Sequence, residues 1–136
     1  MRKLTEQIVE ALGYACPAAN VVKGTFDKVT VSAPALVVYL APESFHPAST
    51  WLRQGIGYVY VIGHADATVH EQYMSSIGYA EEVENCLLNL LNIQTVVPAQ
   101  PLQALTYQGA VMVSFTFLYV TEEQYLYQLE VENAES

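Results

Sequence analysis

Alternation of apolar and polar side chains in residues 110–121 constrains the fold more than any other feature of this sequence. In this segment Val111, Val113, Phe115, Phe117 and Tyr119 alternate with Met112, Ser114, Thr116 and Leu118. Successive side chains of a strand point to opposite faces of a sheet, so this period of two predicts a strand with one buried face. Residues 29–32 and 51–64 are predicted strands for the same reason, and the nearly continuous apolar run 35–40 predicts a central strand buried on both faces.

Two other segments carry the spacing of helices. Apolar residues recur at helical intervals in residues 4–12, and Gly13 follows them, which predicts a short first helix ending there. Thr68 and Glu71 have the spacing of a capping box, so a second helix is predicted to begin near residue 68. Its apolar stripe consists of Tyr73, Ile77, Ala80, Val83, Leu87, Leu90 and Leu91.

The remaining segments are predicted to connect these elements. Residues 14–27 and 41–47 are predicted loops, because they show no sustained period and contain proline or glycine. Residues 97–101 are predicted to break the second helix. Residues 102–107 and 110–121 then resemble two antiparallel strands that turn around Gln108-Gly109.

A chain of 136 residues suits one domain. The pattern predicts an α+β domain over residues 1–121, with a mostly antiparallel or mixed sheet of four to five strands flanked by two helices. Residues 122–136, here called the C-terminal segment, are predicted to form an extended strand or interaction arm, because Tyr125, Tyr127, Leu129 and Val131 occupy every second position. These four side chains are the predicted subunit interface. A last strand packed on the same subunit is an equally open alternative.

Charge is distributed very unevenly along the chain. No lysine or arginine occurs from Gln54 to Ser136, and the net charge of the whole chain is −9. Phosphate-binding surfaces need cations that displace the counterions of nucleic acid, so this part of the chain is expected to repel DNA. Glu81, Glu82 and Glu84 are the predicted DNA-repelling face. The sequence is 52% hydrophobic with only 14% charged residues, which predicts apolar surface available to a partner.

A few residues invite a catalytic or metal-binding interpretation. His64, Asp66, His70 and Glu71 could hold a divalent ion, but their spacing matches no established ligand motif. A turn and the first turn of a helix explain them better. Consecutive glutamates on the second helix are typical of a solvated face. We therefore predict no metal site and no catalytic residues.

Cofactor and membrane binding are not predicted either. Gly55-Ile56-Gly57 lacks the third glycine of a phosphate-binding loop and is interpreted as a bulge or bend in a strand. Cys16 and Cys86 are interpreted as reduced, structural thiols. No apolar run is long enough to cross a bilayer, which favours a protein made and assembled in the cytoplasm.

The order of elements resembles the tail terminator proteins of long-tailed bacteriophages. It runs from a helix to Pro34-Ala35-Leu36-Val37-Val38-Tyr39-Leu40, to Gly57-Tyr58-Val59-Tyr60-Val61-Ile62, to a long acidic helix and to residues 109–120. The resemblance implies a virion structural protein with no catalytic residues. It implies a hexameric ring that caps the tail tube, joins it to the neck proteins and lets DNA pass without binding it specifically.

Other functions stay open at this stage. The tyrosine-rich and glutamate-rich C-terminal segment departs from the terminator pattern, so another phage tail or neck subunit is an alternative. A small cytosolic ligand-binding or regulatory α+β domain is a second alternative. A divalent-metal hydrolase that uses His64, Asp66 and His70 is a third.

Overall fold

The computed structural model describes residues 2–24, 33–47, 52–63, 68–102 and 109–120. Within these residues, two helices and five strands form one α+β unit. In chain order they are α1 (Arg2–Ala15), β1 (Asn20–Lys23), β2 (Ala35–Pro47), β3 (Leu52–Ile62), α2 (Val69–Leu88), β4 (Ile93–Pro101) and β5 (Val111–Val120). The predicted fold class is therefore confirmed.

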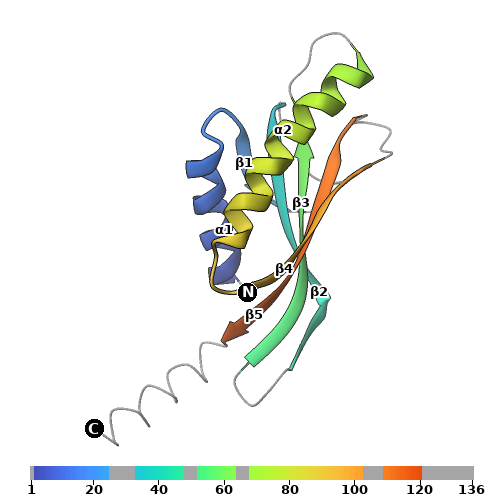
Figure 1. Cartoon of the computed structure of the whole chain (residues 1–136). Coiled ribbons are helices and arrows are strands. Elements are labelled where there is room, and N and C mark those ends of the chain that lie inside the picture. Colours follow the sequence, from blue (N-terminus) through green and yellow to red (C-terminus); the bar gives the residue numbers. More distant parts are fainter. Residues whose placement is uncertain (1, 25–32, 48–51, 64–67, 103–108, 121–136) are drawn as a thin grey trace, which may run out of the picture.

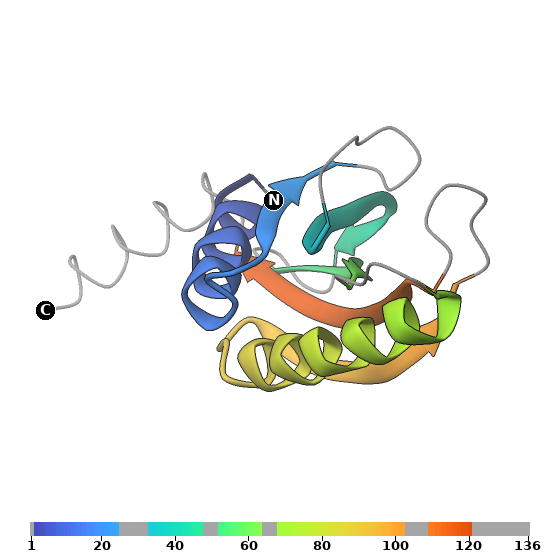
Figure 2. The ribbon, with the colours of Figure 1, turned by 90° about the horizontal axis from the view of Figure 1, so that it is seen from above.

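The five strands form a single mixed sheet (Figure 1). Their spatial order is β1-β2-β3-β5-β4; β1 runs parallel to β2, and the other neighbouring pairs are antiparallel. In the view from above, α1 lies beside β1 and α2 lies along β5 and β4 (Figure 2). Both helices pack into one hydrophobic cluster on the same face of the sheet. The sheet is thus covered by helices on one face.

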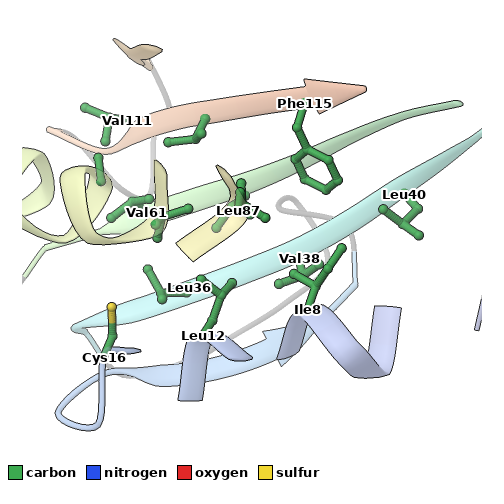
Figure 3. Close-up of a cluster of buried hydrophobic side chains, with 14 of the residues drawn as sticks. Ile8, Leu12, Cys16, Leu36, Val38, Leu40, Val61, Leu87, Val111 and Phe115 are labelled. Atoms are coloured by element: carbon green, nitrogen blue, oxygen red, sulfur yellow. The ribbon is translucent and has the colours of Figure 1, made fainter. Parts of the chain in front are cut away.

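The main core lies between this face and the two helices (Figure 3). Its largest fully buried side chains are Leu4, Ile8 and Leu12 from α1, Val83 and Leu87 from α2, and Leu36, Val38, Val59, Val61, Phe115 and Phe117 from the sheet. Burial of each such side chain stabilises the fold by about 1.5–3 kcal/mol. A smaller cluster on the other face contains Ala35, Val37, Ile62 and Ala110. Residues 35–38 are therefore buried on both faces, whereas Tyr39, in the same run that was predicted to be buried on both faces, is half-buried.

Helix α2 begins where the capping pattern predicts. Thr68 has extended backbone angles, and its side chain accepts a hydrogen bond of 3.1 Å from the Glu71 N–H. Eight residues after Thr68, the buried Ser76 hydroxyl accepts a bond from the Gly63 N–H and donates to the Gln72 carbonyl oxygen, both at 2.8 Å. These bonds join the end of β3 to the helix. No helix in the described part of the chain is long and apolar enough to span a bilayer.

Three predicted boundaries in the first half of the chain are wrong. Helix α1 passes through Gly13 to Ala15, and the Cys16 N–H still bonds to the Leu12 carbonyl oxygen, because buried Cys16 anchors the last turn in the core. The predicted loop 14–27 contains β1, whose four residues are too few to show a period. The predicted loop 41–47 belongs to β2, which pairs with β3 as far as Pro47.

The second half contains two further corrections. Helix α2 ends at Leu88, where the Asn89 N–H bonds back to the Cys86 and Leu87 carbonyl oxygens, so Leu91 lies beyond the helix and is fully exposed. The strand before β5 occupies residues 93–101 and so includes residues 97–101, where we predicted a break of the helix. Residues 103–108 and the strand predicted at residues 29–32 lie outside the described residues, as does the C-terminal segment.

The bulge or bend predicted at Gly55-Ile56-Gly57 corresponds to a register shift opposite Gly55, but the extra residues lie in the neighbouring strand. Strand β3 pairs with β5 without a register shift from Leu52 to Val61. The irregularity lies in β2, where the register with β3 shifts between Ala41 and His46. Gly55 and Gly57 stand opposite Phe117 and Phe115, and the missing side chain of Gly57 makes room for the Phe115 ring in the core.

Candidate functional site

The face of the sheet opposite the helices is the first candidate surface. It is buried at Ala35, Val37 and Ile62, and we call its accessible part, which includes Tyr58 and Ile56, the open face. Its central row crosses four strands, because Tyr39 is paired with Tyr58, Tyr58 with Ser114, and Ser114 with Val97. Paired residues of neighbouring strands point to the same face of a sheet. These four side chains therefore lie side by side on the open face.

Three tyrosines on this face form a stacked row. The ring centroids of Tyr39 and Tyr58 are 6.3 Å apart with planes inclined by 17°, and those of Tyr58 and Tyr60 are 6.2 Å apart with planes inclined by 19°. All three side chains are half-buried. Tyrosine combines a large apolar surface with a polar tip, and it is enriched at protein interfaces. The row is thus a stacked aromatic surface of the kind that contacts other proteins.

The rest of the open face is apolar or uncharged. Ile56 is 36% exposed and Val97 is 40% exposed, which makes them the most accessible large apolar side chains of this face. At one end, the Gln54 Nε2 donates a hydrogen bond of 3.2 Å to the Gln94 Oε1. Among the side chains that the structure describes on the open face, none is charged.

The helical layer on the other side of the sheet carries carboxylates. Its exposed acids are Glu6 and Glu10 on α1 and Glu71, Glu81 and Glu82 on α2. Two of the three residues predicted to repel DNA, Glu81 and Glu82, are therefore at the surface. The third, Glu84, is half-buried, and its Oε1 accepts a hydrogen bond of 2.8 Å from the Ala99 N–H of β4. Glu84 thus has a structural partner, while DNA repulsion by this face stays a prediction.

The helical layer also exposes a second set of apolar side chains. Met74 is 55% exposed and Leu88 is 64% exposed on α2, and Leu91 is fully exposed just after it. Tyr14, 87% exposed at the end of α1, lines a shallow depression of about 430 Å³ together with Glu10, Gly13 and Pro17. We call Leu88 and Leu91, at the C-terminal end of α2, the α2 patch; Met74 lies about 21 Å away along the helix and is not part of it. The α2 patch and the open face lie on opposite sides of the sheet.

The residues considered for metal binding are only partly described. His70 and Glu71 are exposed in the first turn of α2, whereas His64 and Asp66 lie outside the described residues. Over the residues that the structure describes, no three histidine, cysteine or acidic side chains are placed to hold a metal ion together.

Both cysteines are free thiols in the region of the core. Cys16 is buried and Cys86 is half-buried. Burial raises the thiol pKa of Cys16, and the nearby Glu82 carboxylate and Cys86 raise it further. Burial alone raises the thiol pKa of Cys86. Both groups are therefore poor nucleophiles at neutral pH, in agreement with the structural role predicted for them.

The sequence pattern revealed only part of the open face. Alternation in residues 51–64 placed Tyr58 and Tyr60 on one face, which the structure confirms. It could not place Val97, because residues 97–101 were interpreted as a helix break. The interface residues predicted in the C-terminal segment, Tyr125, Tyr127, Leu129 and Val131, lie outside the described residues.

No protein-family model matches this chain, and no curated protein is detectably similar to it. The phage tail resemblance accordingly rests on element order alone. What the chain does must be argued from its surfaces.

Proposed function

We propose that this protein is a virion structural subunit that assembles into a homo-oligomeric ring of a phage tail, as a tail terminator or another neck component. The observation that carries the proposal is the presence of two apolar surfaces on opposite sides of one subunit. The open face exposes Ile56 and Val97 beside the tyrosine row, and the α2 patch exposes Leu88 and Leu91.

The arrangement of these surfaces favours a head-to-tail assembly. An isologous dimer uses the same patch on both copies, whereas a heterologous contact joins one patch to a different patch on the next copy. Repetition of a heterologous contact gives a ring if the rotation closes. The open face of one copy against the α2 patch of the next is such a contact. That the ring contains six subunits is implied by the resemblance in element order to tail terminator proteins.

The charge distribution supports passage of DNA through such a ring. The described carboxylates Glu81 and Glu82 are exposed on the helical layer, and the sequence contains no lysine or arginine after Arg53. Anionic walls repel the phosphate backbone and so do not retain DNA in transit. In this proposal the helical layer faces the lumen beside the α2 patch, and the tail tube and neck proteins bind the two rims of the ring.

A mixing experiment tests the head-to-tail contact. Ile56→Asp removes one surface and Leu91→Asp removes the other, and both positions are exposed, so each variant is expected to fold. Each variant alone should lose the head-to-tail contact and assemble far more weakly than the natural chain by light scattering and native mass spectrometry. An equimolar mixture should give heterodimers, because every pair retains one intact contact. Glu10→Gln, an exposed position on α1 outside both surfaces, should assemble like the natural chain.

Three outcomes would contradict the proposal. A natural chain that stays monomeric at high concentration would favour a small ligand-binding or regulatory domain. Variants that assemble like the natural chain would show that these surfaces are not used. Duplex DNA that binds the natural chain tightly at physiological salt would exclude the anionic passage, whereas a Glu81→Lys and Glu82→Lys double variant is expected to gain DNA affinity.

A further inference from the structure

The two edges of the sheet differ in how they can pair with another strand. Strand β4 forms one edge and β1 forms the other. An edge strand offers unpaired N–H and C=O groups to any added strand, so proteins usually protect long edges. Here the β4 edge is protected within the subunit, and no strand in the described part of the chain covers the β1 edge.

The β4 edge is blocked in three ways. Pro98 and Pro101 have no N–H to donate. The Ala99 N–H is already bonded to the Glu84 carboxylate at 2.8 Å. The register with β5 also shifts between Val97 and Gln100, and such a bulge twists an edge away from regular pairing. A further strand cannot extend the sheet here without displacing Glu84.

Within residues 2–24, 33–47, 52–63, 68–102 and 109–120, no strand pairs with the outer edge of β1. The Asn20 N–H donates to the Pro34 carbonyl oxygen at 2.9 Å, and the Gly24 N–H donates to the Val38 carbonyl oxygen at 3.0 Å, so alternate N–H groups point to β2. Val21 and Lys23 lie between them and direct their N–H and C=O groups away from the sheet. Among the described residues, no hydrogen bond reaches these outward groups.

We propose that the β1 edge binds the C-terminal segment of a second copy of this chain as an added strand. This inference rests on the proposed assembly and names one of its contacts. The segment has the alternation of a strand, with Tyr125, Tyr127, Leu129 and Val131 at every second position. Main-chain hydrogen bonds to Val21 and Lys23 supply affinity in this mode of binding, and alternate side chains supply specificity.

Charge complementarity identifies the occupant. The segment 122–136 contains Glu122, Glu123, Glu130, Glu132 and Glu135 and no basic residue, and all five basic residues of the chain lie at or before Arg53. Lys23 is one of these five, and it is exposed at the end of β1. Lys23 and Val21 share the helix-facing side of the sheet, because their partners Val38 and Leu36 do. The added strand should place Glu130 and Glu132 on this side and its apolar residues on the side of Val22.

Zero-length crosslinking of amines to carboxylates tests this placement in the full chain. Equal amounts of ¹⁴N- and ¹⁵N-labelled protein are assembled, crosslinked with a carbodiimide and digested. We expect crosslinks from Lys23 to Glu130 or Glu132 that join light peptides to heavy ones. Lys23→Arg keeps the charge and removes the reactive amine, so it should lose the crosslink and retain the assembly.

Hydrogen exchange provides a second readout that does not depend on Lys23. The Val21 and Lys23 amides should be protected from exchange in the assembly of the natural chain. They should exchange freely in Tyr127→Pro, because proline prevents the C-terminal segment from pairing along its full length. Tyr127→Phe should keep the protection. Crosslinks within single copies, or protection that persists in diluted monomers, would overturn binding in trans. An assembled ring with unprotected Val21 and Lys23 amides would overturn this inference alone, whereas a chain that never assembles would overturn the proposed function as well.

Discussion

Gly57 of β3 stands directly opposite Phe115 of β5, and the Phe115 ring fills the space that a side chain at position 57 would need. A Cβ added to Gly57 would also lie 2.7 Å from Leu40 Cδ2. The missing side chain therefore lets a fully buried phenylalanine lie across two neighbouring strands in the centre of the core.

Gly57→Ala is expected to destabilise the protein by about 1–3 kcal/mol, because the extra methyl group overpacks the core. Gly78→Ala is the matched control, since nothing lies within 4 Å of an added Cβ at this exposed helical position. It should stabilise the fold by about 0.5–1 kcal/mol through helix propensity. Urea unfolding of both variants measures the difference, and equal effects of the same sign would refute this account of Gly57.

Ser76→Ala is expected to cost about 1–3 kcal/mol, because it leaves the buried Gly63 N–H without its acceptor. Ser75→Ala, one position earlier and half-buried, should change the free energy of unfolding much less. Gly63→Ala should be more damaging than Ser76→Ala, because its Cβ would lie 2.6 Å from the Ser75 carbonyl carbon, which is backbone and cannot move aside easily. Thermal unfolding of the three variants gives this ranking, and a reversed order would contradict the close approach of β3 to α2.

Glu84→Ala should speed hydrogen exchange at Ala99 and lower stability by about 1 kcal/mol, because the N–H of an edge strand loses its acceptor. Glu84→Gln retains an acceptor oxygen and should preserve most of the protection. Glu81→Ala removes an exposed carboxylate from the same helix and serves as the control. If Ala99 exchanges at the same rate in all four proteins, Glu84 does not protect the edge.

The cysteine thiols should make stability depend on alkaline pH. Burial raises the pKa of both thiols above the ordinary value of 9.0, so the folded protein holds these protons more tightly than the unfolded chain. The resulting contribution to stability is complete below pH 9 and is lost as the pH rises through the raised pKa values. Cys16→Ala with Cys86→Ala should flatten this decline. A natural chain whose stability falls no faster than that of the double variant above pH 9 would contradict the effect of burial.

Thiol reactivity gives an independent check on the same two groups. Cys86 is half-buried and should react slowly with a disulfide reagent in the native protein, whereas buried Cys16 should react only after unfolding. Cys86→Ala isolates the Cys16 reaction. Fast labelling of Cys16 under native conditions would show that its side chain is accessible.

Local sequence patterns were sufficient to predict those elements whose signal lies within a short stretch of the chain. The alternation around Val113 predicted β5, and the pair Thr68 and Glu71 predicted the start of α2, because both signals arise from backbone geometry within a few residues. The α+β class followed from the number and kinds of such segments. The anionic character of the chain after Arg53 also needs no structure.

Long-range pairing decided the rest. β1 is a strand because β2 lies beside it, and Gly13 remains helical because Cys16 is held in the core. Residues 93–101 are a strand because β5 pairs with them, which brings Val97 beside Ser114 and lets Glu84 reach Ala99. The alternation within β3 already separates the two faces of that strand. Only the packing of both helices on one side makes the other side an open face. The sequence could not show this, because residues distant in sequence must meet before either face is covered.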